Sequence, residues 1–377
     1  MSTPVHVNPS NQLGPQAATS DILAPVGWAP PETRSATSLL VDGGFKELVS
    51  TDDDVVVMPI ADALTTFPWV QELMFSLIDP SEDPLLEQAF ENTDPPLGTF
   101  TWVKDGAVLD QPTQSFTVMT IPQERQFIHD ITVIGKDARV DSVSGSAVPP
   151  ALSRGTHVSI SETFIGDGAQ VRSIDVDRWG KRMEVYSWDR ARIGANASSS
   201  SISVAVSAVG KHKSDSHTIV GENSSLSSHT IVLAPEGTSR DMSTNVQLDA
   251  RGAQAEQISR MVSDGGHLRN VNTLTASADG VRGFLECSGL MLSDAGRIES
   301  IPALDSLVDQ AQLSHEASVG MIDDEKLDYL MSAGLDEDAA RDLIVQGFLQ
   351  LEDDRIPSSV REQVEKLIEA AREAENM

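Results

Sequence analysis

The residues best suited to chemistry are a single cysteine and an adjacent histidine–glutamate pair in the last quarter of the chain. Cys287 lies in GFLECSGLML, and His315 and Glu316 lie in LSHEASVG. Thiolate, imidazole and carboxylate groups all bind iron, so the three residues are candidate metal ligands. Their spacing alone does not show that they converge. A cysteine in an apolar strand is usually a small buried residue, and alternation places Cys287 on the face of Leu285, which favours burial.

Several common catalytic sites are excluded because their motifs are missing from the sequence. It contains no G-x-x-x-x-G-K-[ST] phosphate loop, no G-x-G-x-x-G, no G-x-S-x-G and no H-E-x-x-H. With one cysteine, the chain can form neither an internal disulfide nor a cysteine-rich zinc site. We therefore expect no P-loop nucleotide site in this chain.

The charge balance narrows the class of partner. Of 377 residues, 57 are acidic and 27 are basic, which gives a net charge of −30. Proteins that bind nucleic acid or a membrane surface use basic patches, so we expect neither partner. We find no apolar run near the roughly 18 residues of a membrane span and no signal-peptide pattern, so we expect a cytoplasmic protein. Asp outnumbers Glu by 34 to 23 and Arg outnumbers Lys by 19 to 8, which fits either a salt-rich cytoplasm or an ordinary acidic protein.

The elements that must position the candidate ligands are short strands. Over residues 98–310, apolar residues such as Ile202 and Val204 alternate with small polar ones, and glycines recur at short intervals. This period of two predicts a mainly β protein, and so many short strands predict a sandwich, a barrel or a solenoid. The string SHTIV occurs at 216–220 and again at 228–232. Such repetition favours the stacked coils of a parallel β-helix.

The chain on either side of these strands has a different composition. Residues 1–37 are rich in Pro, Ser, Thr and Ala and predict a disordered tail. Residues 38–97 form a mixed N-terminal region, with a short helix predicted around Trp69–Ile78. Residues 311–377 predict a separate C-terminal helical domain.

The predicted C-terminal helices have recognisable ends. Asp323 and Asp336 are suitable N-caps for the first two helices, and Gly334 suits the position after the first. A third helix is predicted to begin near Pro357. Three short helices after a β body indicate a separate unit.

The stretch 313–349 resembles the C-terminal signature of a known family. Its sequence is LSHEASVGMIDDEKLDYLMSAGLDEDAARDLIVQGFL. In order, it contains a His–Glu pair followed by Ala and Ser, an acidic helix start, an aromatic–Leu pair before a Gly turn, and a second helix ending in Gly–Phe. This order closely resembles the SufB/SufD family of iron–sulfur cluster assembly proteins. The segment 98–112 is similar to the start of the family's β-helix, so the resemblance extends over residues 98–370.

The resemblance implies a right-handed parallel β-helix followed by a helical domain, acting as a scaffold that is not an enzyme. Two subunits would pair, and each would dock an ABC-type ATPase, SufC, on its C-terminal helices. A transient iron–sulfur cluster, of the four-iron four-sulfur type, would form at the dimer interface. Iron and sulfide donors would supply it, and recipient apo-proteins would take it. The helix residues expected to contact the ATPase are Leu327, Leu330, Met331, Leu343, Ile344 and Phe348.

Residue by residue, the resemblance also suggests a ligand set. Cys287 matches the SufB thiol, Glu316 matches a nearby SufB carboxylate, and His315 is at a position where both SufB and SufD carry histidine. Ser314 departs from SufB, which has glutamate there. This blend of SufB-like and SufD-like features fits a homodimer of the short archaeal SufB-like form, and one cysteine cannot support a two-thiol persulfide relay within a subunit. Two alternatives stay open: a cytoplasmic β-helix enzyme acting on polysaccharide, and a structural SufD-like partner without a ligand role.

Overall fold

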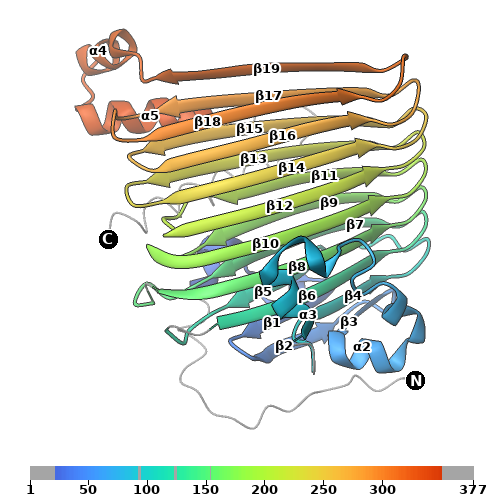
Figure 1. The fold of residues 1–377 in the computed structure, drawn as a ribbon. Helices are drawn as coiled ribbons and strands as arrows, with labels where there is room; N and C mark the ends of the chain where they lie inside the picture. Colours follow the sequence, from blue (N-terminus) through green and yellow to red (C-terminus); the bar gives the residue numbers. More distant parts are fainter. Residues whose placement is uncertain (1–21, 92–94, 123–124, 153, 350–377) are drawn as a thin grey trace.

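The fold is a parallel β-solenoid of about eight turns, built from two sheets (Figure 1). The computed structural model describes residues 22–349 apart from 92–94, 123–124 and 153. Over most of this length, successive strands alternate between the two sheets, so that each strand pairs in parallel with the strand two places later. The parallel β-helix predicted from alternation and repetition is confirmed.

The strands divide into two sheets, which we call sheet A and sheet B. The pairings at the N-terminal end, β1 with β2 and β3 with β4, are antiparallel. Sheet A contains β1 (Ala36–Val41), β2 (Gly44–Ser50), β5 (Thr113–Val118), β7 (Arg139–Ala147), β9 (Gln170–Arg178), β11 (Ser198–Ala205), β13 (Ser225–Pro235), β15 (Gln254–Asp264), β17 (Arg282–Met291) and β19 (Gln312–Met321). Sheet B contains β3 (Val55–Pro59), β4 (Thr99–Val103), β6 (Arg125–Ile134), β8 (Arg154–Ile165), β10 (Arg182–Ile193), β12 (Lys211–Val220), β14 (Ser239–Leu248), β16 (His267–Ala276) and β18 (Arg297–Ser306).

The corners that lead from sheet B to sheet A repeat one backbone conformation. Asp137 and Asn196 both have a φ of 54°, and Gly168 and Gly252 have φ values of 71° and 76°. The backbone N–H at this position donates to a carbonyl of the next turn, as that of Asp137 does to Asp167 at 2.8 Å. Asp, Asn and Gly adopt positive φ at the least cost, which explains their recurrence between the strands.

A segment of short helices covers the outer face of sheet B near the N-terminal end of the solenoid (Figure 1). We call residues 60–91 the strap. Its fully buried Leu86 packs in one cluster with Val158 and Trp188 of sheet B. The strap contains α2 (Ile60–Thr66), η3 (Pro68–Glu72), η4 (Pro80–Glu82) and α3 (Pro84–Glu91).

The helix predicted around Trp69–Ile78 is wrong, because the strap forms only the 3-10 turn η3 there and then irregular turns. Phe75 has a φ of 59°, which a right-handed helix does not contain. The backbone N–H groups of Phe75 and Leu77 donate to the carboxylate of Glu162 on β8, at 2.6 and 2.7 Å. A long-range acceptor thus replaces the helical carbonyls.

The N-terminal boundary also needs correction. The tail predicted for residues 1–37 is ordered from residue 22, while residues 1–21 lie outside the described part. Leu23 and Val26 are fully buried in a cluster with Phe116 of sheet A, and Val26 belongs to the 3-10 turn η1 (Ala24–Val26). A second turn, η2 (Pro31–Thr33), leads into β1. The prediction of a disordered tail assumed that this segment buries too little apolar surface to offset the conformational entropy lost on ordering. These apolar contacts supply that burial.

At the other end, the solenoid extends to Met321, because β19 pairs with β17 over its whole length. The start of the helical domain, predicted at residue 311, is therefore corrected to α4 (Asp324–Ser332), followed by α5 (Glu337–Leu349). The caps are confirmed: Asp323 accepts from the N–H of Glu325, and Gly334 has a φ of 106°. The third predicted helix lies outside the described residues. Within the described ranges, no helix combines the length and the apolar character needed to cross a membrane.

Candidate functional site

Cys287 lies on β17 and faces the inside of the solenoid. Its direct strand partners are Ser259 on β15 and Ala317 on β19. The side chain is fully buried, in a cluster that includes Met261 and Leu268. The burial expected from its alternation with Leu285 is confirmed, so only the last turn of the solenoid separates this thiol from the open end.

A hydrogen bond crosses the solenoid to the thiol. Asn272 on β16, in sheet B, donates from Nδ2 to Cys287 Sγ at 3.3 Å and to Ser259 Oγ at 3.1 Å. Asn272 is itself only 2% exposed. No pattern in the sequence singles out Asn272, because the contact joins the two sheets and depends on how they face each other.

The two other candidate ligands lie on the terminal strand β19 and are exposed. His315 pairs with Leu285 and Glu316 pairs with Glu286. Since successive side chains alternate between faces, His315 shares the inner side with Cys287, while Glu316 lies on the outer side. Glu286 is held there by an ion pair with Arg260 at 2.8 Å.

The geometry thus brings the thiol and the imidazole onto one face and leaves the carboxylate on the other. Among the described residues, no group of three or more His, Cys, Asp and Glu side chains is arranged to hold a metal ion. Within one chain, then, Cys287 and His315 could supply part of a ligand set. A complete set requires a rearrangement, a second chain or an added ligand, and the roles of Cys287, His315 and Glu316 remain predictions.

The terminal turn presents a surface that no other element of the described chain covers. β18 and β19 end the two sheets, and Figure 1 shows them at the top of the solenoid. Apolar side chains that would be buried in an inner turn are exposed here: Leu304 is 37%, Val319 44% and Met321 45% exposed. A free sheet edge with apolar neighbours is suited to pairing with another chain.

Of the two C-terminal helices, α5 packs on sheet A and α4 packs against α5. Val345 and Leu349 of α5 are buried in the cluster that lies on sheet A. Arg341 donates to the backbone carbonyl of Leu292 at 3.1 Å. The residues predicted to contact the ATPase divide by exposure: Met331 and Leu343 are exposed, Leu330, Ile344 and Phe348 are half-buried, and Leu327 is buried.

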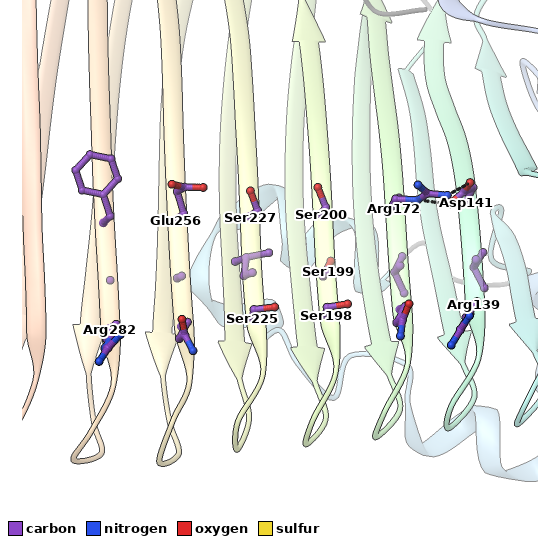
Figure 2. Close-up of a pocket in the computed structure, with 18 of the residues that line it drawn as sticks. Arg139, Asp141, Arg172, Ser198, Ser199, Ser200, Ser225, Ser227, Glu256 and Arg282 are labelled. Carbon is purple, nitrogen blue, oxygen red and sulfur yellow. Dashed lines mark hydrogen bonds and ion pairs between the residues drawn. The ribbon is translucent and has the colours of Figure 1, made fainter. Parts of the chain in front are cut away.

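A long groove runs across the first residues of the sheet-A strands, on their outer side (Figure 2). It has a volume of about 1130 Å³. Figure 2 shows serines in the middle of the row, including Ser200 and Ser227, and charged residues toward the ends, including Arg282. Arg172 donates two hydrogen bonds to Asp141, at 2.7 and 2.6 Å. These serines lie on β11 and β13, and the parallel register of the two strands aligns them in one groove.

Inside the solenoid, small polar side chains surround a group of acids. Burial, reinforced by the neighbouring Asp175, raises the pKa of Asp177 to about 8. Burial lowers the pKa of His212 to about 3, and this neutral ring accepts a hydrogen bond from the buried Arg240 at 2.8 Å.

The known proteins to which this chain is similar are described as iron–sulfur cluster assembly proteins. The profile described as "SUF system FeS cluster assembly, SufBD core domain" matches residues 117–348. An iron–sulfur cluster assembly SufBD family protein of Archaeoglobus fulgidus is 28% identical over 338 residues, which are 90% of each chain. A protein of the same description from Methanothermobacter thermautotrophicus is 27% identical over 93% of this chain and 86% of its own. The Bacillus subtilis iron–sulfur cluster assembly protein SufB is 24% identical over 72% of this chain and 59% of its own.

Proposed function

Because the chain belongs to the SufB/SufD family of iron–sulfur cluster assembly proteins, we propose that it is a non-enzymatic cytoplasmic scaffold on which a nascent cluster is built. The observation that carries this proposal is the position of Cys287, one strand below the uncovered end of the solenoid and on the same side as His315. Iron and sulfide reach this end from separate donors, and the finished cluster passes to recipient apo-proteins.

The scaffold works as a homodimer joined through its terminal turns. The exposed apolar side chains of β18 and β19 support this arrangement, since a second copy would cover them. Each copy contributes one thiol and one imidazole, so the pair supplies four ligands of the kinds that bind iron. Glu316, on the outer side of β19, serves as an additional ligand or base after the strands of the two copies meet.

A SufC-type ATPase docks on α4 and α5. Support comes from Met331 on α4 and Leu343 on α5, which are 40% and 48% exposed, while α5 itself is anchored to sheet A. Helix α5 packs on β15, the strand that pairs with β17. Movement of the ATPase would therefore be transmitted to the end of the solenoid. In this arrangement the partner binds the nucleotide, and this chain holds the cluster.

The test is anaerobic reconstitution with ferrous iron and sulfide, followed by measurement of bound iron, acid-labile sulfide and the thermal midpoint. Cys287→Ser should lose most of the bound iron, because a serine hydroxyl does not readily ionise and is a poor iron ligand. Glu316→Ala and His315→Ala should each reduce the iron content, with folding retained, since both side chains are exposed. Glu222→Ala, on an exposed corner, is the matched control.

Two results would contradict the proposal. A Cys287→Ser protein that holds as much iron and sulfide as the wild type would exclude a ligand role and leave a structural SufD-like partner as the better description. Light scattering that shows only monomer, with the ATPase and nucleotide present, would exclude the shared site.

A further inference from the structure

Arg260 on β15 contacts both the C-terminal helix α5 and a carboxylate on β17. Its Nη1 lies 2.8 Å from Glu286 Oε1, and its Cζ lies 6.0 Å from the centre of the Phe348 ring on α5. The ion pair is partly shielded from solvent, since the two side chains are 28% and 22% exposed. A planar guanidinium can bind a carboxylate along its edge and an aromatic ring on its face. Arg260 therefore connects α5 with β17.

The strand register shows that Arg260 reaches past its direct neighbour to make this ion pair. Arg260 is paired with Ser288, whereas Glu286 lies two residues earlier on β17. The guanidinium therefore extends diagonally along the outer side of sheet A. Ser288 donates from Oγ to the same oxygen of Glu286 at 3.4 Å, so Glu286 Oε1 is held by two partners.

Glu286 is also the direct neighbour of the candidate ligand Glu316. The two residues are paired in the parallel register of β17 and β19, so their side chains share the outer side. Adjacent strands are about 4.8 Å apart, and like charges at such a position repel each other. Within the described part of the chain, neither glutamate has an ion pair other than the one with Arg260. Arg260 thus neutralises one of two adjacent carboxylates.

These contacts connect the helix proposed to dock the ATPase with a residue of the proposed iron site. We propose that Arg260 is a positioning residue, which sets the charge acting on Glu316 by neutralising Glu286 while the Phe348 ring supports its guanidinium. When α5 moves away from β15, the guanidinium loses this support, the ion pair weakens and more negative charge faces Glu316. The inference rests on the proposed function, in which the ATPase docks on α5 and Glu316 takes part in holding iron.

The same connection acts in the reverse direction, because coupling between two sites is reciprocal. A ferrous ion held at Glu316 attracts the carboxylate of Glu286 and competes with Arg260 for it. Without its carboxylate partner, the guanidinium is less firmly placed against the Phe348 ring. Iron loading should therefore make α5 open more often, even when no ATPase is present.

Native-state hydrogen exchange of the Val345 amide on α5 measures this coupling in the full chain. The chain is compared before and after anaerobic reconstitution with ferrous iron and sulfide, and bound iron is measured in the same samples. In the wild type, iron loading should speed this exchange at least about fivefold, the lower end of typical coupling between two sites. Arg260→Gln and Phe348→Leu should each remove the difference, and the double variant should show no further change. Arg260→Lys should keep part of it, because lysine keeps the charge.

Arg172→Gln is the matched control. Arg172 pairs with Asp141 on the outer side of the same sheet, but its strand β9 is three strands away from β15. This variant should respond to iron as the wild type does. Comparing iron-loaded with iron-free protein for each variant separates coupling from lost packing, which would change both samples alike.

The possible failures point to different errors. Wild-type exchange that does not change when iron is bound would overturn the role of Arg260 and leave the scaffold intact. A response to iron that survives in Arg260→Gln or in Phe348→Leu would do the same. A wild-type chain that binds no iron would overturn both the scaffold and the role of Arg260, so the two failures are distinguishable.

Discussion

The strap depends on one buried carboxylate, which makes Glu162→Gln a sensitive test of how the outer face of sheet B is held. Glu162 is fully buried. Its Oε2 accepts from the backbone N–H of Phe75 at 2.6 Å and from His129 Nε2 at 2.8 Å, and its Oε1 accepts from the N–H of Leu77 at 2.7 Å. Glutamine keeps the shape but turns one of the two acceptors into an NH₂ donor.

The expected cost follows from which oxygen is replaced. With the new NH₂ group at the Oε1 position, the N–H of Leu77 loses its acceptor and two other bonds are kept; the opposite orientation would break two. One buried N–H without a partner costs about 1–3 kcal/mol. The loss of charge from the remaining two bonds adds about 1 kcal/mol, since hydrogen bonds to charged groups are the stronger kind. We therefore expect local destabilisation of about 2–4 kcal/mol.

Native-state hydrogen exchange measures this locally. A cost of 2–4 kcal/mol should speed exchange of the Phe75 and Leu77 amides by about 30-fold to about 1,000-fold, provided that exchange proceeds through opening of the strap. Amides in the middle of β13 should be unaffected, because they lie far along the solenoid. Glu222→Gln on an exposed corner is the control. Unchanged exchange at both strap amides would refute the claim that the carboxylate holds the strap.

Two further predictions concern the partner and pH. Leu343→Glu puts a charge on the exposed face of α5 and should abolish co-purification of the ATPase while the circular dichroism spectrum stays unchanged. Val108→Glu, at another exposed apolar position, should leave co-purification intact. If the Leu343→Glu protein still co-purifies with the ATPase, the docking site does not include this face of α5. Burial and the neighbouring Asp175 raise the pKa of Asp177 to about 8, so the folded chain keeps a proton that the unfolded chain releases above a pKa of about 4. This contribution to stability is lost as the pH rises from about 4 to about 8. Asp177→Asn cannot ionise and should narrow the gap between the thermal midpoints at pH 5 and pH 8; an undiminished gap would show that this carboxyl does not retain its proton on folding.

Much of the architecture follows from local sequence. The alternation around Ile202 and Val204 and the recurrence of Asp, Asn and Gly at positive φ are properties of single strands and corners, which is why the solenoid was predictable. The caps Asp323 and Asp336 were also visible, because a capping side chain bonds a backbone N–H only two or three residues away. The family followed from an ordered motif in residues 313–349, which the profile match over 117–348 bears out.

Tertiary structure decided everything that depends on contacts between distant residues. Composition made residues 22–37 resemble a tail, but their burial depends on Phe116 in a later strand. The helix predicted in the strap does not form, because two of its backbone N–H groups donate to Glu162, more than eighty residues later in the chain. The candidate ligands were named from the sequence, whereas the separation of Glu316 from Cys287 follows from the side-chain alternation between β17 and β19. No sequence pattern predicts the contact between Asn272 and Cys287, since the two sheets must face each other before an amide on one can reach the thiol on the other.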